Sequence, residues 1–504
     1  MGQNAGETQR RDRVSEMLDW SATAACRVGL TRLSRNLWAR SAKRFTESHH
    51  RGTRDDEENE RTSPPADERI EIHSVWMVEV FPPSLSIRLG RELGRLPSGG
   101  IYRHPDESLA EEVARARRHP LGGWWWNLGV FNNMSVGRRP GGEAIDLPIA
   151  IDHLFLTMYL VAPSLACVVA QFVLTDQAAS TIDEIVRARY TTEGIRRRDG
   201  SVSTHTPLTF KRDLVGAELD RLHDDCKEWF GATVPGAFYD GLLEGHLPTC
   251  YFMTLDKVRP LTDQARVEYL DPVGVNMAYG ALASTDLPGL RLSEPTGVKR
   301  RRHTFYLAGK RDELFLGDDS LGGHGRNRGG FTVALHMTLN RFIAMWGLER
   351  TLLGYEMAFG RLRDSFSATH PTSTRKNLAT LSAAGTNIAS LGGDALAVAR
   401  DAQRLVDDQR AFENELVTFE PIQREMWRFE GTWTDVMRDD IQASAQRVAE
   451  AEASARDFEL TRASIISSRT NLTLQSSLRW LTVVLVVLTI ALVAIGWATL
   501  RAMD

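Results

Sequence analysis

The loop from Gly317 to Gly330, GDDSLGGHGRNRGG, carries the residue types that could bind phosphate. Glycines expose backbone N–H groups, and this loop immediately precedes a helix expected to start near Phe331, where a helix N-terminus favours anions. The candidate ligands are Gly325, Arg326, Arg328 and Gly329. The loop matches no Walker or dinucleotide-binding pattern, and two acidic residues precede the glycines. A surface connection is therefore the favoured interpretation, and no cofactor is predicted.

The sequence contains no recognisable motif for a catalytic nucleophile or a metal site. Ser320 lacks the GxSxG elbow, and Cys226 and Cys250 lack a protease-like context although His223 and His246 lie near them in sequence. Adjacent acidic pairs on a helix point about 100° apart, so they are not assembled for acid–base work. We therefore predict no catalytic residue and no metal site.

Two basic runs and one aromatic run could form binding surfaces. The basic runs, 196–198 and 299–302, have no interleaved aromatic residues, and 61 Lys and Arg against 65 Asp and Glu leave a net charge of -4. Nucleic acid is therefore not an expected partner. In a strand, the run Trp124–Trp126 places two rings on one face and one on the other. A place at the edge of the core is favoured, with a binding platform as the alternative.

The composition indicates an intracellular chain of two or three domains. Its 504 residues exceed one compact core, and its four cysteines show no zinc-ligand spacing. The opening MGQNAGETQRRDR develops no apolar stretch of the kind that a secretory signal needs. A reducing cytoplasm is therefore the expected surroundings of the main body.

The strongest single signal is an apolar segment from Leu481 to Leu500. Its roughly 20 residues carry no charge and match a hydrocarbon core about 30 Å thick. The flanking residues are those that prefer the headgroup zone: Arg479, Trp480, Trp497 and Arg501. We predict one transmembrane helix in the cell membrane, with the N-terminal body in the cytoplasm because the four residues that follow are easier to translocate.

A second apolar stretch, Leu154 to Thr175, also approaches the length of a membrane span. Its centre reads Ala162-Pro163-Ser164, a turn signal, and its flanks lack Lys and Arg. Its β-branched and aromatic residues favour two core strands that meet at the turn. A second membrane segment remains the alternative.

The predicted fold class is an α+β cytoplasmic domain followed by a long helical stalk and one C-terminal transmembrane helix. Changes of composition along the chain divide it into six segments. These are a basic amphipathic helix (1–47), a charged disordered linker (48–69), the α+β domain (70–330), a helical region interrupted at Gly392-Gly393 (331–420), a stalk helix opened by Pro421 (421–480) and the membrane helix (481–500). The heptad candidates in the stalk are often small or charged, so self-association is expected without a readable number of copies. They are Ile441, Val448, Ala455, Arg462 and Arg469.

The stretch ISSRTNLTLQSSLRWLTVVLVVLTIALVAIG, beginning at Ile466, resembles the junction of stalk and first membrane helix in CorA-like divalent-cation transporters. The matching pieces are Arg469-Thr470-Asn471 and Leu481-Thr482. The resemblance implies an α/β cytoplasmic domain, a helical stalk and a pentamer around an ion path. Only residues 501–504 follow the apolar segment, without the Gly-Met-Asn loop or the second membrane helix of that family. The Arg/Ala/Gly-rich texture also loosely resembles membrane-anchored components of actinobacterial conflict systems.

These observations predict a single-pass, membrane-anchored and non-enzymatic protein. Its cytoplasmic domain would sense a signal or bind a protein partner, as a homo-oligomer and within a conflict or stress-response system. One alternative is a reduced CorA-like cation channel in which Asn471, Gln475 and Thr482 face a shared axis. Another is an enzyme whose site lies within residues 124–330.

Overall fold

The computed structural model describes residues 55–97, 109–118, 124–136, 142–196, 202–243, 247–261, 267–275, 281–293, 304–316, 328–368, 374–422 and 431–501. The predicted N-terminal helix (1–47) lies outside these residues. The helices are α3 (Asp55–Arg61), α4 (Ser86–Arg95), α5 (Leu109–Ala116), α6 (Asp176–Arg187), α7 (Pro207–Thr233), α8 (Arg311–Leu316), α9 (Arg328–Ala368), α10 (Thr374–Asp407), α11 (Gln409–Glu413) and α12 (Trp433–Arg501), with short 3₁₀ turns η1 (Pro83–Leu85) and η2 (Glu268–Leu270).

A sheet of ten strands forms the centre of the body. Its order is β12-β9-β10-β11-β8-β1-β5-β4-β2-β3, and its neighbours are antiparallel except for the parallel pairs β11–β8 and β2–β3. The strands are β1 (Ile70–Phe81), β2 (Trp124–Asn133), β3 (Glu143–Ile145), β4 (Ile151–Ala162), β5 (Leu165–Leu174), β8 (Thr249–Leu255), β9 (Leu282–Ser284), β10 (Arg291–Ser293), β11 (Thr304–Lys310) and β12 (Phe419–Pro421); β6 (Glu193–Arg196) and β7 (Val202–His205) form a separate hairpin. A mixed α/β domain is therefore confirmed.

The apolar stretch 154–175 lies in β4 and β5, so the prediction of two core strands is confirmed. The two strands pair antiparallel around the turn at Pro163, and both are buried along their whole length. Strands buried on both faces read as continuous apolar runs, which is why this stretch resembles a membrane segment in the sequence.

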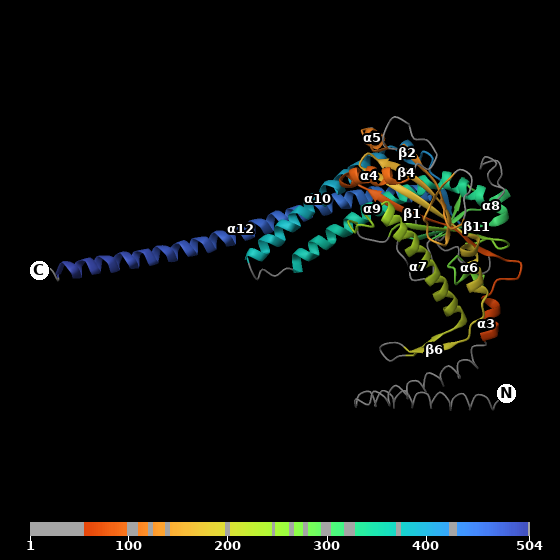
Figure 1. Cartoon of the computed structure of the whole chain (residues 1–504), viewed down its shortest axis with the longest axis horizontal. Coiled ribbons are helices and arrows are strands. Elements are labelled where there is room, and N and C mark those ends of the chain that lie inside the picture. The colour runs from red at the N-terminus through yellow and green to blue at the C-terminus, as the bar shows by residue number, and fades with distance from the viewer. Residues whose placement is uncertain are drawn as a thin grey trace, which may run out of the picture.

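Helices cover both faces of the sheet. On one face, Gly347 of α9 lies so close to β1 that a Cβ atom there would be 2.8 Å from Val78 Cγ1. On the other face, the Tyr251 hydroxyl of β8 donates to the Leu219 carbonyl of α7 at 3.0 Å. The body is thus a sandwich of three layers, with α9 on the face that also carries α10 and α12 (Figure 1).

The charged segment 48–69 differs from its predicted disorder wherever it is described. Asp55 and Asn59 of α3 are buried, and Asp55 accepts hydrogen bonds from the backbone N–H and the hydroxyl of Thr192. Lys211 of α7 donates to the Thr62 carbonyl at 3.0 Å. The residues that contact this segment lie well over a hundred residues away in sequence. Local composition does not reveal such contacts, and for this reason the sequence alone predicts a solvated linker.

Two predicted boundaries in the helical part also differ. Pro421 does not open the stalk helix, because it ends β12, where it pairs with Leu282 of β9. The long helix α12 begins at Trp433 instead, after Thr432 and Asp435 have formed a reciprocal capping pair. Helix α10 runs unbroken across Gly392-Gly393, with Gly392 packed against Glu452 of α12.

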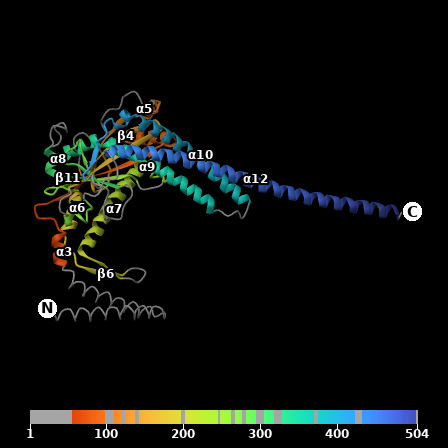
Figure 2. The ribbon, with the colours of Figure 1, turned by 180° about the vertical axis from the view of Figure 1, so that it is seen from behind.

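The 69-residue helix α12 leaves the body after its first turns (Figures 1 and 2). Ile441, Val448 and Ala455 are buried, and α12 contacts both α9 and α10 there. Every described side chain of α12 after Ala455 is exposed. Among the described residues, one helix segment, Leu474–Ala498, is by length and composition able to span a membrane, and none of it is buried against the body.

Candidate functional site

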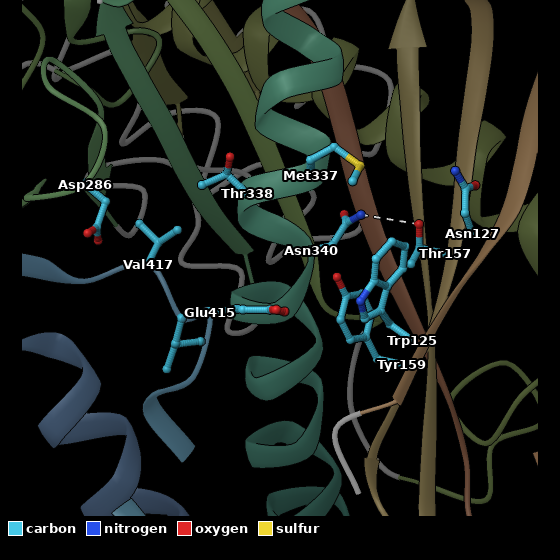
Figure 3. Close-up of a pocket in the computed structure, with 11 residues that line it drawn as sticks. Trp125, Asn127, Thr157, Tyr159, Asp286, Met337, Thr338, Asn340, Glu415 and Val417 are labelled. Atoms are coloured by element: carbon cyan, nitrogen blue, oxygen red, sulfur yellow. Dashed lines mark hydrogen bonds between the residues drawn. The ribbon is translucent and has the colours of Figure 1, made fainter. Parts of the chain in front are cut away.

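A groove of about 440 Å³ crosses the outer side of α9 on the described surface. One wall is formed by β2 and β4, the floor by α9, and the other wall by the loop after β9 and the segment between α11 and β12 (Figure 3). The lining residues are Trp125, Asn127, Thr157, Tyr159, Asp286, Met337, Thr338, Asn340, Glu415, Leu416 and Val417. Its volume lies within the range of about 300–1,000 Å³ that small-molecule sites occupy.

The run Trp124–Trp126 supplies the aromatic wall of this groove. As the strand spacing predicts, Trp124 and Trp126 stack with each other on one face of the sheet, with ring centroids 6.4 Å apart. Trp125 points to the opposite face and stacks on Tyr159 of the neighbouring strand, at 6.5 Å between centroids and 24° between planes. Trp125 remains 44% exposed, so one wall of the groove offers an accessible indole.

A buried polar cluster underlies the floor. The Asn340 amide donates to Thr157 Oγ1 at 3.3 Å, and it lies 2.9 Å from His336 Nε2, which is itself 2.8 Å from Thr157 Oγ1. Burial lowers the pKa of His336 to about 3, so the ring is neutral over the physiological range. Asn340 Oδ1 and His336 Nδ1 have no hydrogen-bond partner within the described part of the chain. The cluster is therefore incompletely satisfied next to an open groove.

The segment 413–416 places a carboxylate on the opposite wall by means of a strained turn. The Leu416 N–H donates to the Glu413 carbonyl at 3.1 Å, Asn414 has φ -56° and ψ 125°, and Glu415 has φ 55°. This is a type II turn, whose third position favours glycine because φ is positive there. A residue with a side chain costs about 1–2 kcal/mol in that conformation. Such strain is concentrated at functional sites.

Electrostatic interactions connect the two walls. Burial raises the pKa of Tyr159 to about 12; the Glu415 carboxylate adds to the increase and the Arg341 guanidinium opposes it. Arg341 itself donates to the Ala411 carbonyl at 2.6 Å, and burial lowers its pKa. Figure 3 shows the Glu415 side chain extending across α9 toward Tyr159. Aromatic faces and a carboxylate thus converge on one space.

The residues singled out for phosphate binding do not lie in this groove. Gly325 and Arg326 fall outside the described residues, and Arg328 and Gly329 form the first turn of α9, so phosphate binding there remains a prediction. In the described part of the chain, no group of three or more His, Cys, Asp and Glu side chains could hold a metal ion. Burial raises the pKa of the three described thiols, Cys167, Cys226 and Cys250.

A second cavity of about 470 Å³ lies where α9 and α10 meet the turn after β1 and the loop after α7. Tyr355 and Asp394 line it, and the Asp394 carboxylate accepts a hydrogen bond from the Ser84 N–H at 3.1 Å. Its remaining lining is mostly apolar or backbone. The groove over α9 combines accessible aromatic, amide and acidic groups and is the stronger candidate.

On α12, the predicted membrane flanks Arg479, Trp480 and Trp497 are exposed beside the apolar surface. Arg501 is the last helical residue, and Leu481 and Leu500 lie within the helix. The polar positions Asn471, Gln475 and Thr482 are exposed, and at about 100° per residue they fall within an arc of about 40°.

Searches of protein-family models, curated proteins and solved structures find no match to this chain. Sequence reasoning identified Trp125 but missed the other groove residues. His336 and Asn340, four residues apart in a largely apolar stretch of α9, were the available signal for the floor. No sequence signal pointed to Glu415, because the sequence does not show that a Glu in a loop adopts a positive φ.

Proposed function

We propose that this protein is a single-pass, membrane-anchored sensor. Its α/β body binds a small ligand in the groove over α9, and α12 links that body to the bilayer. The observation that carries the proposal is the continuity of α12, which packs on α9 and α10 through Ala455 and then extends, fully exposed, into the apolar segment Leu474–Ala498.

The exposed end of α12 has the composition of a membrane anchor. Its large apolar side chains are 49–68% exposed from Leu481 to Trp497. Soluble proteins rarely expose a contiguous apolar surface of this size to water. In a bilayer each central Leu, Ile or Val contributes about 0.3–0.6 kcal/mol to insertion, so the segment gains several kcal/mol. The residues between Ala455 and Leu474 hold the body about 28 Å from the membrane, at about 1.5 Å per residue.

The groove is connected by sequence to the anchor. Its wall at Glu415–Val417 is followed directly by β12, which pairs with β9 at the sheet edge and contacts α12. A ligand that draws this wall toward α9 would shift β12 and the start of α12. The shift would be transmitted from the groove wall through the short strand β12 to the rigid helix α12. A membrane-coupled sensor needs such a continuous connection between its ligand site and its membrane segment.

Self-association would use the exposed part of the stalk. Ile441, Val448 and Ala455, three of the heptad candidates, are buried within the chain and are not available to a second copy. Asn471, Gln475 and Thr482 form one exposed stripe, and this observation favours the second candidate function, a reduced CorA-like channel in which the stripe lines an axis. The double substitution Leu472→Cys and Leu474→Cys tests it by crosslinking in native membranes, because two exposed thiols on different sides of the helix let each chain bond to two neighbours. A ladder ending at a closed oligomer supports the channel, and monomer alone refutes it.

Membrane fractionation with alkaline extraction tests the anchor. We expect the intact protein to stay in the membrane, whereas the paired substitution Leu485→Arg and Leu488→Arg, which costs about 5–7 kcal/mol of insertion, releases it. Leu460→Arg, on the exposed neck of the same helix, is the matched control and should leave the protein membrane-bound. If the paired variant also resists extraction, α12 is not the anchor.

A further inference from the structure

The charges around the groove are predominantly negative. Asp286 and Glu415 both line it, whereas none of the described Lys and Arg residues does. The Arg341 guanidinium interacts electrostatically with both Tyr159 and Glu415; it is 7% exposed and already donates to the Ala411 carbonyl. Asp286 accepts a hydrogen bond from the Thr418 N–H. The groove therefore presents a negative lining to a ligand.

Glu415 is the carboxylate that has no structural task. Asp286 holds the chain at Thr418, but the Glu415 carboxylate has no ion pair and no hydrogen bond with any residue that the structure describes. It nevertheless occupies the glycine position of a type II turn. The charge of Glu415 interacts with the Arg341 guanidinium, but no ion pair or hydrogen bond joins the two. A strained side chain whose carboxylate is left without a hydrogen-bond donor in the described protein indicates a partner outside it.

The opposite wall has the chemistry that complements a cation. The stacked rings of Trp125 and Tyr159 offer an electron-rich face, and Trp is the best of the aromatic residues at binding cations. Beneath the floor, the Asn340 nitrogen donates to Thr157, and Asn340 Oδ1 is buried without a hydrogen-bond partner among the described residues. Figure 3 shows Trp125 and Tyr159 on one side of α9, Asn340 on α9 itself, and Glu415 extending from the other side.

We infer that the groove binds a small organic cation, an amine or a quaternary ammonium compound. Its charged head lies between the Trp125–Tyr159 pair and the Glu415 carboxylate, and its remainder packs on Met337 and Leu416. The inference deepens the proposed function and rests on it, since it names the ligand class of the same groove.

The test uses the full-length protein in zwitterionic lipid nanodiscs and three probes of similar shape: benzyltrimethylammonium, benzyl alcohol and benzoate. Saturation-transfer NMR titrations give the dissociation constant of each. We expect saturable binding of the ammonium probe, and binding at least about tenfold weaker for the alcohol and the benzoate. A cation–aromatic contact together with a charge pair justifies that factor.

Two pairs of variants assign the binding to the groove. Glu415→Gln and Trp125→Ala should each weaken benzyltrimethylammonium about tenfold. Their matched controls, Glu413→Gln in the same turn and Trp124→Ala on the other face of β2, should leave it unchanged, because neither residue lines the groove. Glu415→Gly distinguishes loss of binding from loss of folding, since it removes the carboxylate while relieving the turn.

The possible outcomes separate the two proposals. Saturable binding that depends on Trp125 and Glu415 supports the cation. Trp125-dependent binding of benzoate or benzyl alcohol in preference to the ammonium probe overturns the cation but keeps the groove as a ligand site. Ammonium binding that survives both substitutions, or no saturable binding, overturns the cation in this groove. The membrane fractionation tests the anchor independently of all these results.

Discussion

Stability should fall as the pH rises, because a carboxyl group is enclosed in the centre of the sheet. Glu79 of β1 is fully buried, and its two oxygens accept from the backbone N–H groups of Tyr239, at 2.8 Å, and Phe238, at 3.3 Å. Burial raises the pKa of Glu79 to about 8 from its ordinary 4.5, although these N–H groups lower it. Gly236 lies against it, since a Cβ there would be 2.0 Å from Oε2.

The sign follows from proton linkage. Below pH 4.5 the Glu79 carboxyl is protonated in both the folded and the unfolded chain, and its full contribution to stability is present. Between about 4.5 and 8 only the folded chain keeps the proton, so the free energy of unfolding falls with pH and levels off above about 8. At about 1.4 kcal/mol for each tenfold change in the acid constant, the loss has an upper limit of about 5 kcal/mol.

Glu79→Gln should remove this dependence, because the amide has the same shape and does not ionise. Urea unfolding of the full-length protein followed by tryptophan fluorescence at pH 5 to 9 measures it. The free energy of unfolding of the variant, relative to that of the native protein, should rise by about 2–5 kcal/mol from pH 5 to pH 9. For Glu413→Gln, on the exposed turn, the free energy of unfolding should change with pH as it does in the native protein. A gap between Glu79→Gln and the native protein that stays constant over this range would refute the buried-carboxyl argument.

Three further predictions concern packing, a buried anion and thiol reactivity. Gly347→Ala should destabilise the body by about 1–3 kcal/mol in thermal melts, because its Cβ meets Val78, whereas Gly360→Ala, with open space in the same helix, should stabilise by about 0.5–1 kcal/mol. Glu68→Gln should lower the free energy of unfolding by about 2–4 kcal/mol in urea, because the carboxylate accepts hydrogen bonds from four backbone N–H groups and the Tyr269 hydroxyl. Asp67→Asn, on the surface, should leave the free energy of unfolding unchanged, and an equal loss in both variants would contradict this role of Glu68. Maleimide at pH 8 should leave the three described cysteines unmodified until denaturant is added, because burial raises their thiol pKa. Peptide mass spectrometry locates the label, and rapid labelling of any of these three in the native protein would refute this. They are Cys167, Cys226 and Cys250.

The elements that depend on local pattern could be predicted from the sequence. The apolar segment beginning at Leu481 is long, uncharged and bracketed by Trp and Arg, and such a run is helical in any environment that accepts it. The strands on either side of Pro163 and the alternation of Trp124–Trp126 follow from a period of two and a turn residue. Neither depends on what the segment packs against.

Only the tertiary structure decided the roles of polar residues whose partners are remote in sequence. Asp55 and Glu68 look solvated in a charged stretch, yet they cap backbone groups of residues such as Thr192 and Val258. Pro421 suits the first turn of a helix, yet pairing with β9 places it in a strand. The groove forms because α9 brings Trp125 opposite Glu415. Charge and shape at such a site arise from contacts between segments, and no single segment encodes them.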